Sequence, residues 1–288
     1  MVTPLQEYLF DLNGFIKLEK ALTKVEVADL NMGLDVLPKL DIDEWYGYLH
    51  REVTDDATRG LIYQQIYEAG KPFEKLIDHP SWISKIKHFV GGENTFDYNH
   101  GDLFIDENFV SIREKGEAIG LHSGGHTGTQ RTQFRYRDGS FHCGQINLLI
   151  ALTDIGDNDG ATMVIPGSHK SNIIHPHLKN NLIGTGASVD AVEGAIEVHM
   201  NAGDAILFVD AISHGSAKRT NEGERRILVF RYGPSWGNFR FGYRPSPELL
   251  DRLTERQKQI VYPFKEYERT PNRLDESKCV GRRRSMAQ

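Results

Sequence analysis

The hydrophobic positions in the first part of the chain recur mainly at helical spacing. Residues 14–18 alternate as a short strand, and Thr23 and Glu26 then form a capping-box pattern ahead of a helix. The apolar residues of that helix are Val27, Leu30, Leu34 and Leu37. Two further segments, 58–69 and 81–89, have the composition and spacing of helices, so the pattern predicts a mostly helical N-terminal part.

Further along the chain the pattern changes to short apolar runs that turn-forming residues interrupt. Asn, Asp and Gly gather between the runs, for example at 137–140 and 157–160, and predict turns. The runs are residues 103–105, 109–112, 145–153, 162–165, 195–200, 205–209 and 226–232. Many short strands with this punctuation are typical of a β-sandwich or jelly roll.

These changes of pattern also set the expected organisation of the chain. Residues 1–92 form the mostly helical part, 93–244 the jelly-roll core, and 245–288 a charged, helical C-terminal extension. No internal repeat and no low-complexity linker separates the three segments. The sequence therefore predicts one mainly β domain over residues 1–288, with helices packed around a jelly roll.

Composition and charge exclude several classes of function. The 288-residue chain has a formal net charge of -6, which gives no basic footprint for nucleic acid, and the basic run 281–284 is interpreted as a solvated tail. Cys143 and Cys279 stand in no zinc or redox spacing, which fits a reducing compartment. The start of the chain lacks the pattern of a signal peptide, and the apolar run 146–152 is too short to span a bilayer. We expect a cytoplasmic protein with no membrane or nucleic-acid partner.

Two histidines in a glycine-rich stretch, GLHSGGHTGTQ at 120–130, are candidate metal ligands. A mononuclear iron site of the common oxygenase type uses two histidines and one carboxylate. The carboxylate is expected two positions after the first histidine, but Gly124 follows His122 at that spacing and Gly128 follows His126. The stretch is therefore a candidate iron site that lacks its usual carboxylate.

A second pair of residues suits a chelating dicarboxylate. His214 follows the apolar run 205–209, and Arg225 opens the next run eleven positions later. A hairpin between the two runs would bring the imidazole, which binds metals, close to a fixed guanidinium, which binds a carboxylate in bidentate fashion. Taken alone, a capped strand end and a surface arginine explain this pair equally well.

Two other motifs are given structural interpretations. Residues 233–237 match the G-x-S-x-G pattern of a hydrolase nucleophile, but the segment after Ser235 does not have the sequence of the helix that this motif requires. His175 and His177 flank a proline and are interpreted as a surface pair.

Longer stretches resemble the phytanoyl-CoA dioxygenase family. Residues 145–170, with INLLIALTDIGDNDGATMVIPGSHK, and residues 214–225, with HGSAKRTNEGER, are similar to its two late motifs, and LFDLNGFIKLEKALTKVEVADL resembles its N-terminal strand and helix. The resemblance implies a double-stranded β-helix, cupin-like in architecture, that binds Fe(II), 2-oxoglutarate and O2. It implies His214 as the distal iron ligand, Arg225 as the anchor of the cosubstrate's far carboxylate, and a structural role for His169.

The resemblance also narrows the choice of the proximal iron ligand, but it does not indicate which group replaces the missing carboxylate. We favour His122 over His126 because it follows the apolar residues of a strand end. A carboxylate from elsewhere or water could complete the site, chloride could occupy the position left open at Gly124 as in the iron halogenases, or the three histidines could form the ligand set. The candidates for a displaced carboxylate are Glu117, Asp138 and Asp154. Loss of the metal, leaving a cupin-like binding protein, is the remaining alternative.

The expected reaction is the oxidation of an unactivated C–H bond of a small metabolite, with release of succinate and CO2. Hydroxylation is the favoured outcome and halogenation the alternative. The cationic, aromatic loop at 130–137 contributes Arg135, and the segment after the last core run contributes Trp236, as candidate substrate contacts. If these residues line the mouth of the site, an anionic substrate fits. The sequence does not indicate an oligomeric state.

Overall fold

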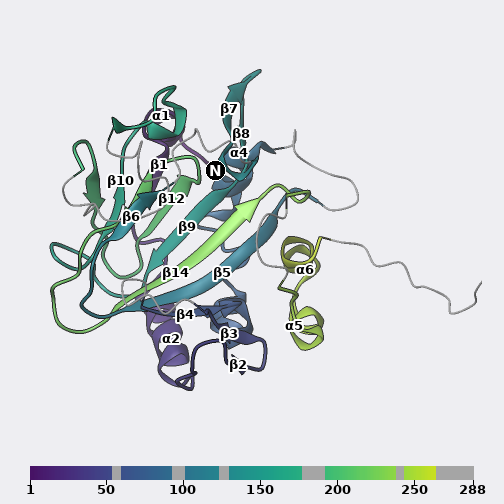
Figure 1. The fold of residues 1–288 in the computed structure, drawn as a ribbon. Coiled ribbons are helices and arrows are strands. Elements are labelled where there is room, and N and C mark those ends of the chain that lie inside the picture. The colour runs from purple at the N-terminus through teal and green to yellow at the C-terminus, as the bar shows by residue number, and fades with distance from the viewer. Residues whose placement is uncertain (54–59, 93–100, 123–129, 177–191, 238–242, 264–288) are drawn as a thin grey trace, which may run out of the picture.

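Two antiparallel β-sheets lie face to face and form the double-stranded β-helix that was expected (Figure 1). The computed structural model describes residues 1–53, 60–92, 101–122, 130–176, 192–237 and 243–263. The larger sheet has the order β1 (Phe15–Leu18), β12 (Ala205–Val209), β9 (Ile146–Ala151), β14 (Arg225–Gly233), β5 (Phe104–Arg113), β4 (Leu61–Gln64), β3 (Leu49–Arg51) and β2 (Trp45–Tyr46). The smaller sheet has the order β11 (Ile196–Val198), β10 (Thr162–Val164), β13 (His214–Ser216) and β6 (Ile119–His122).

The alternation of side chains along the strands separates an inner from an outer core. On β14, Ile227 and Val229 face the smaller sheet and pack with Ile206 and Phe208 of β12. Their neighbour Leu228 faces the other way and belongs to the outer core. Because successive residues of a strand point to opposite faces, one buried strand contributes side chains to both the inner and the outer core.

Helices cover the outer face of the larger sheet. They contribute Phe10, Leu30, Phe89 and Ile260 to the outer core, each of them fully or almost fully buried. The helices are α1 (Pro4–Asn13), α2 (Lys24–Asp35), α3 (Lys71–Glu74), α4 (Ile83–Val90), α5 (Pro247–Arg252) and α6 (Glu255–Val261), with short 3-10 turns η1 (Ile66–Ala69), η3 (Gln130–Thr132) and η4 (Ser168–Lys170). The predicted class, a mainly β fold wrapped by terminal helices, is confirmed.

The predicted start of α2 is also confirmed. The Thr23 hydroxyl accepts a hydrogen bond from the backbone N–H of Glu26 at 3.2 Å. The Glu26 carboxylate accepts one from the backbone N–H of Thr23 at 2.8 Å. This reciprocal capping satisfies two of the donors that a helix start leaves open.

The helix expected over residues 58–69 is wrong. The structure has strand β4 there, followed by the 3-10 turn η1, and β2 and β3 precede it. Gly60 has φ +73°, and a side chain on it would meet the carbonyl oxygen of Ile112 at 2.3 Å, so the chain passes directly against β5 at this point. The apolar run at the start of the segment then pairs with β5, Leu61 opposite Ile112, and a distant strand thus overrides the local helical pattern.

The segment predicted as a cationic loop after His126 is a hairpin. Its strands are β7 (Phe134–Arg137) and β8 (Ser140–Cys143), and the predicted turn lies between them. Asp138 and Gly139 both have positive φ, 51° and 79°, as a tight hairpin turn of this kind requires. The hairpin stands out from the rest of the fold beside α4 (Figure 1).

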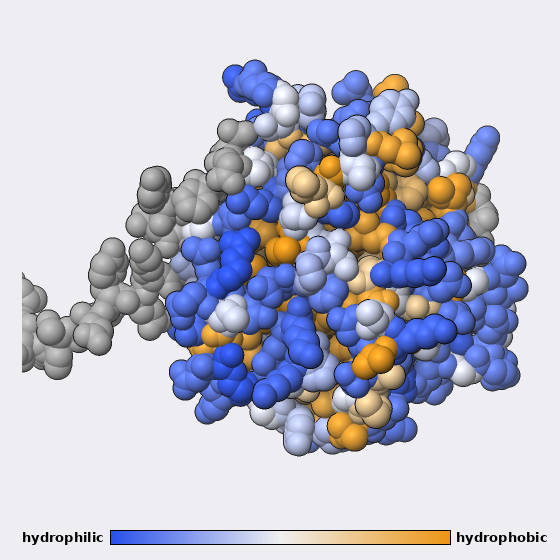
Figure 2. Space-filling view, turned by 180° about the vertical axis from the view of Figure 1, so that it is seen from behind, coloured by the Kyte–Doolittle hydropathy of each residue, from blue (hydrophilic) through white to orange (hydrophobic). Residues whose placement is uncertain are grey.

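Figure 2 shows apolar side chains interspersed with hydrophilic ones on the face opposite to that of Figure 1. Within the described residues, no helix is long and apolar enough to cross a membrane.

Candidate metal and cosubstrate site

The histidine at the end of β6 and the histidine at the start of β13 are direct neighbours. His122 and His214 are paired in the antiparallel register of the two strands. Their ring centroids are 4.2 Å apart, with the ring planes inclined at 55°. Directly opposed residues of an antiparallel pair point to the same face, so both imidazoles face the same space. The structure therefore brings together two residues that are 92 positions apart in the sequence.

Backbone carbonyls fix the tautomer of both histidines. Nδ1 of His122 donates to the carbonyl oxygen of Gly120 at 3.1 Å, and Nδ1 of His214 donates to that of Ile212 at 2.9 Å. A carbonyl oxygen can only accept, so each Nδ1 carries a proton, and in the neutral imidazole Nε2 then carries the lone pair. This is the arrangement that a metal-binding imidazole needs.

Burial keeps the distal histidine uncharged. Desolvation first, and the neighbouring His122 second, lower the pKa of His214 to about 3. A neutral imidazole is the form that ligates a metal, so His214 needs no deprotonation at neutral pH. Its ring also contacts the ring of Phe208 on β12, with centroids 4.7 Å apart.

The predicted hairpin between His214 and Arg225 is wrong, although the two residues do face the same interior. His214 opens β13 of the smaller sheet, whereas Arg225 opens β14 of the larger one. The guanidinium bridges the sheets, since its Nη1 donates to the carbonyl oxygen of Gly160, which precedes β10. The connection passes between sheets because residues 214–216 pair with β10 and β6 instead of with β14.

The environment of Arg225 fits an anion. The side chain is buried, and its Nε has no hydrogen-bond partner. Burial first, and then the charges of Arg113 and Arg219, lower its pKa to about 9. Arg219 is paired with Asp159 at 2.7 Å, whereas Arg225 forms no ion pair with any described residue. A buried guanidinium without a carboxylate is costly unless a ligand supplies one.

Two residues that the sequence analysis missed complete this cationic end. Arg113 lies opposite Arg225 in the register of β5 and β14, and its Nη1 donates to the hydroxyl of Ser216 at 2.6 Å. Ser216 lies two residues after His214 on the same face of β13, a separation of about 6.6 Å for an extended chain. A short dicarboxylate that chelates a metal at the histidines can therefore reach Ser216 and Arg225. The spacing His-x-Ser was the available signal for Ser216, whereas Arg113 needed the strand register.

The carboxylates considered as replacements for the missing ligand are engaged elsewhere. Glu117 is exposed and pairs with Lys218 at 2.7 Å, and Asp138 is exposed at the hairpin turn. Asp154 accepts the backbone N–H of Ala202 at 2.8 Å. In the part of the chain that the structure describes, no group of three or more His, Cys, Asp or Glu residues could hold a metal ion. His126 and Gly124 lie outside the described residues.

The candidate substrate contacts at 135 and 236 are solvent-exposed. Arg135 lies on β7 of the protruding hairpin and is exposed, and the Trp236 side chain, which follows β14, is 56% exposed. Their positions suit a solvated surface.

The remaining motif residues have structural partners. Nε2 of the buried His169 donates to the carbonyl oxygen of Asp11 in α1 at 3.1 Å. The buried Ser235 hydroxyl donates to the carbonyl oxygen of Gly101 at 2.8 Å, which leaves no free nucleophile for hydrolysis. His175 donates to the carbonyl oxygen of Glu193 at 3.0 Å.

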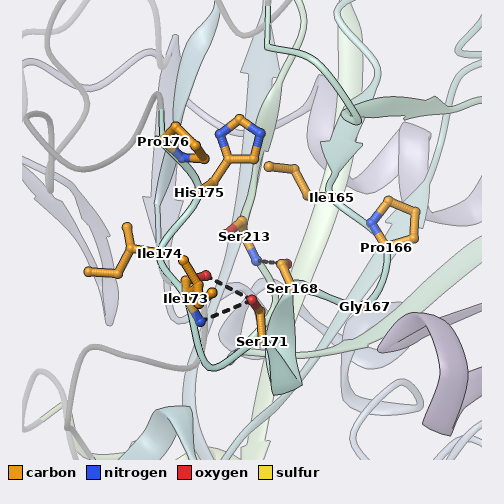
Figure 3. A pocket seen from close by; sticks show the side chains of 10 residues that line it. All are labelled: Ile165, Pro166, Gly167, Ser168, Ser171, Ile173, Ile174, His175, Pro176 and Ser213. Carbon is orange, nitrogen blue, oxygen red and sulfur yellow. Dashed lines mark hydrogen bonds between the residues drawn. The ribbon is translucent and has the colours of Figure 1, made fainter.

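A surface cavity of about 420 Å³ lies close to the strand that carries His214 (Figure 3). Its wall contains Ser213, whose backbone N–H donates to the Ser168 hydroxyl at 2.8 Å. His175 also lines it, but His122 and His214 do not. The cavity is therefore distinct from the space that the histidine pair faces.

Comparison with known proteins agrees with this architecture. HygX of Streptomyces hygroscopicus, solved with nickel and 2-oxoglutarate, superposes with a TM-score of 0.67 over 86% of this chain and 94% of its own, at 21% identity. Dioxygenase cdmD of Talaromyces verruculosus is 28% identical over 191 residues, which are 65% of this chain and 55% of that protein. The iron/alpha-ketoglutarate-dependent dioxygenase penM of Penicillium thymicola is 38% identical over 117 residues, which are 38% of this chain and 33% of that protein.

The chain thus spans about half or less of the length of these two curated relatives. The model of the family described as phytanoyl-CoA dioxygenase matches residues 10–227, which contain both histidines and Arg225. The chain belongs to the phytanoyl-CoA dioxygenase family.

Proposed function

We propose that this protein is an Fe(II)- and 2-oxoglutarate-dependent dioxygenase that hydroxylates an unactivated C–H bond of a small molecule and releases succinate and CO2. The observation that carries the proposal is the combination of two neighbouring imidazoles with a buried guanidinium that lacks a counter-ion. His122 and His214 supply the first part, and Arg225 the second.

Each side chain has a role in this proposal. His122 and His214 hold the iron through Nε2, while the carbonyls at Gly120 and Ile212 keep the rings oriented. Arg225 holds the far carboxylate of 2-oxoglutarate, together with the Ser216 hydroxyl. When bound, iron and 2-oxoglutarate supply the activation of O2 that no amino-acid side chain provides. The chain also keeps His214 neutral by burial and excludes water from the cationic end.

A small-molecule substrate agrees with the fold neighbour HygX, which has been solved with nickel, 2-oxoglutarate and hygromycin B. We further propose that one domain carries the activity. One outer core cluster draws buried residues from Phe10 to Val261, so the terminal helices and the jelly roll share a single core.

Anaerobic spectroscopy tests the assignment. Addition of Fe(II) and 2-oxoglutarate should produce the weak visible charge-transfer band of a bidentate keto-acid chelate. His214→Ala and Arg225→Ala should each remove the band, while His175→Ala, a histidine of the surface cavity, should retain it. Absence of the band from the parent protein, together with absence of succinate formation, would favour a cupin-like binding protein that has lost the metal.

Halogenation is the second candidate, and a specific observation favours it. The residue two positions after His122 is Gly124, and within the described residues no carboxylate takes over as a third ligand. Chloride would then occupy the open position. Gly124→Asp supplies the carboxylate and should suppress chlorinated product if the parent is a halogenase. Hydroxylated product that forms independently of chloride in the parent excludes this candidate.

A further inference from the structure

A row of mainly polar side chains crosses the inner face of the larger sheet, starting at the histidine pair. We call it the polar row; it has one side chain on each of the neighbouring strands from β12 to β2, namely Phe208, Asn147, Arg231, Glu107, Gln64, His50 and Trp45. Its cross-strand pairs are Phe208 with Asn147, Asn147 with Arg231, Arg231 with Glu107, Gln64 with His50, and His50 with Trp45. The link between β5 and β4 is a hydrogen bond from Gln64 Nε2 to the Glu107 carboxylate at 2.9 Å. Adjacent strands lie about 4.8 Å apart, so the row extends over roughly 25–30 Å.

The inner end of the polar row is adjacent to the histidine pair. Phe208 touches the ring of His214. Asn147, its partner on β9, donates to Asp210 at 2.9 Å, and Arg131 forms an ion pair with the same carboxylate at 3.3 Å. A molecule lying along the row would thus present one of its bonds to the metal.

The middle of the polar row contains acceptors that lack donors. Nε2 of Gln64 donates to Glu52 at 3.1 Å and to Glu107, which fixes the orientation of the amide. Its Oε1 is buried and has no hydrogen-bond partner, and the same holds for Oδ1 of Asn147, whose amide nitrogen is engaged by Asp210. Buried acceptors without donors are rare in proteins unless a ligand or water supplies the donor.

Arg231 is the cation at the centre of the polar row. Its Nη1 forms an ion pair with Glu107 at 2.5 Å, and its guanidinium lies over the ring of Phe109, 5.3 Å from the centroid. Its Nε has no partner. The side chain is thus held in place by its neighbours and retains a donor for an oxygen atom of a bound molecule.

The outer end of the polar row combines an exposed aromatic ring with negative charge. Trp45 is 50% exposed and stacks on His50 with ring centroids 4.3 Å apart. His50 lies between Asp43, at 2.9 Å, and the hydroxyl of Tyr243, at 2.6 Å. Burial first, and then the carboxylates of Glu52, Glu107 and Asp43, raise the pKa of Tyr243 to about 12, as expected where the local potential is negative.

Charge and hydrogen-bonding capacity together indicate what the row would bind. Among the described residues, four carboxylates and two arginines lie in the row or are joined to it by hydrogen bonds and ion pairs; the carboxylates are those of Asp43, Glu52, Glu107 and Asp210, and the arginines are at 131 and 231. An anionic molecule would be repelled, and an apolar one would leave the buried acceptors unpaired. An ammonium group fits between carboxylates and the face of an exposed indole.

We propose that the polar row is the substrate subsite and that it selects an extended, hydroxylated small molecule carrying at least one ammonium group. The ammonium lies near Trp45 and Glu52, and hydroxyl groups lie along Arg231 and Asn147. The proposal rests on the proposed function, because only a metal at His214 makes the neighbouring row a substrate site. It differs from the anionic substrate expected from the sequence.

Calorimetric titration of the full chain loaded with Ni(II) and 2-oxoglutarate tests the subsite with three three-ring probes. Kanamycin has hydroxyl and ammonium groups, maltotriose has hydroxyl groups only, and trigalacturonate has hydroxyl and carboxylate groups. We expect affinity to fall in that order. Glu52→Gln and Trp45→Ala should each weaken kanamycin binding by about tenfold, because each removes a partner of the ammonium. Tyr46→Ala, which removes a similarly exposed aromatic ring from the opposite face of the same strand, should leave it unchanged.

Three results would overturn the subsite: tighter binding of trigalacturonate, kanamycin binding that neither variant affects, or no binding of kanamycin and maltotriose at millimolar concentration. The charge-transfer band, measured on the same preparations with Fe(II), separates the two proposals. If the band forms but kanamycin does not bind, only the substrate class fails. If kanamycin binds as expected but the band is absent, the oxygenase assignment fails and the row remains a binding site for hydroxylated amines.

Discussion

Single residues in this protein obtain their chemical properties from backbone groups and from burial. The two imidazoles at 122 and 214 make the same local hydrogen bond: Nδ1–H donates to the carbonyl oxygen of the residue two positions earlier. This hydrogen bond orients each ring and, in the proposed site, makes Nε2 the ligating atom. Arg225 shows the complementary principle, since burial without a counter-ion makes a guanidinium ready for an anion.

The first residue-scale prediction concerns the choice of proximal ligand. His122→Ala should weaken Ni(II) binding by more than about 100-fold, because even changes outside the ligand set commonly cost 10- to 100-fold. His126→Ala should have a much smaller effect, since His122 is the residue in register with His214. Titration calorimetry with Ni(II) on both variants measures the difference. The reverse order of effects would make His126 the ligand.

A second prediction concerns acid stability and His169. Burial lowers the pKa of this histidine to about 4, against an ordinary value of 6.5. In that interval the unfolded chain binds a proton that the folded chain does not, so stability is present above pH 6.5 and is lost as the pH falls towards 4. The loss is about 3 kcal/mol at most. His169→Gln should flatten this part of the profile of unfolding free energy against pH, measured by urea denaturation.

The effect of His169 on acid stability can be distinguished from effects of other histidines by a control variant. His88→Gln, a surface histidine that pairs with Glu7, serves as the control and should leave the profile as it is in the parent. An unchanged profile in His169→Gln would show that this residue is not the source of the acid sensitivity.

Candidates could be found from the sequence where the chemistry of a residue is visible in local spacing. His122, His214 and Arg225 were named as candidates because they follow or open apolar runs in motifs that resemble those of a known family. Arg113 and Asn147 were not, because an isolated arginine or asparagine in a strand has no distinguishing local signal. Their roles depend on which strand lies beside them, and strand register between distant segments is set by tertiary packing.

At the scale of elements, the pairing of β6 with β13 determines the separation of the two histidines. The strands approach so closely at Gly215 that a side chain there would meet the carbonyl oxygen of Ile119 at 2.3 Å. Gly215 lies between His214 and Ser216, so one backbone contact fixes the position of the histidine pair relative to the cationic end.

Gly215→Ala tests this dependence. We expect the added methyl group to push β6 away from β13, to cost about 1–3 kcal/mol in unfolding free energy, and to weaken Ni(II) binding at least tenfold. Urea denaturation and titration calorimetry measure the two effects. Gly156→Ala is the control, because its added carbon meets only a side-chain oxygen at 3.9 Å. Parental metal affinity in Gly215→Ala would show that the close approach does not control the histidine geometry.

Elements were predicted well where local signals suffice. The capping box at Thr23 and the strand at 15–18 are determined by neighbours within one helical turn or by simple alternation. The helix predicted over residues 58–69 was wrong because the apolar run of this segment pairs with β5, about fifty positions away in sequence. Its strand β4, together with β2 and β3 before it, extends the larger sheet and carries the outer half of the polar row. The wrong helix and the two strands that were not predicted therefore concealed the proposed substrate subsite.

At the scale of the whole molecule, the cationic end joins the two sheets. Arg113 reaches from β5 to Ser216 on β13, and Arg225 reaches from β14 to Gly160 before β10. The general architecture followed from the sequence, since the alternation of runs and turns defines a jelly roll. The contacts between the two sheets could not be predicted from the sequence, because they depend on two arginine side chains of one sheet donating hydrogen bonds to acceptors of the other.

A ligand that binds between the sheets should therefore stabilise the whole fold. Ni(II) with 2-oxoglutarate at 100 times its dissociation constant should add about 2.7 kcal/mol to the unfolding free energy, seen as a rise of several degrees in the thermal midpoint. Arg225→Gln should abolish the part that 2-oxoglutarate contributes and keep the part due to Ni(II) alone, because the histidines are unchanged. Arg226→Gln, whose side chain pairs with Asp35 and Glu224 instead, should retain the full shift. Equal 2-oxoglutarate shifts in the two variants would mean that the far carboxylate binds elsewhere, and that the buried cation at 225 serves only to hold the two sheets together.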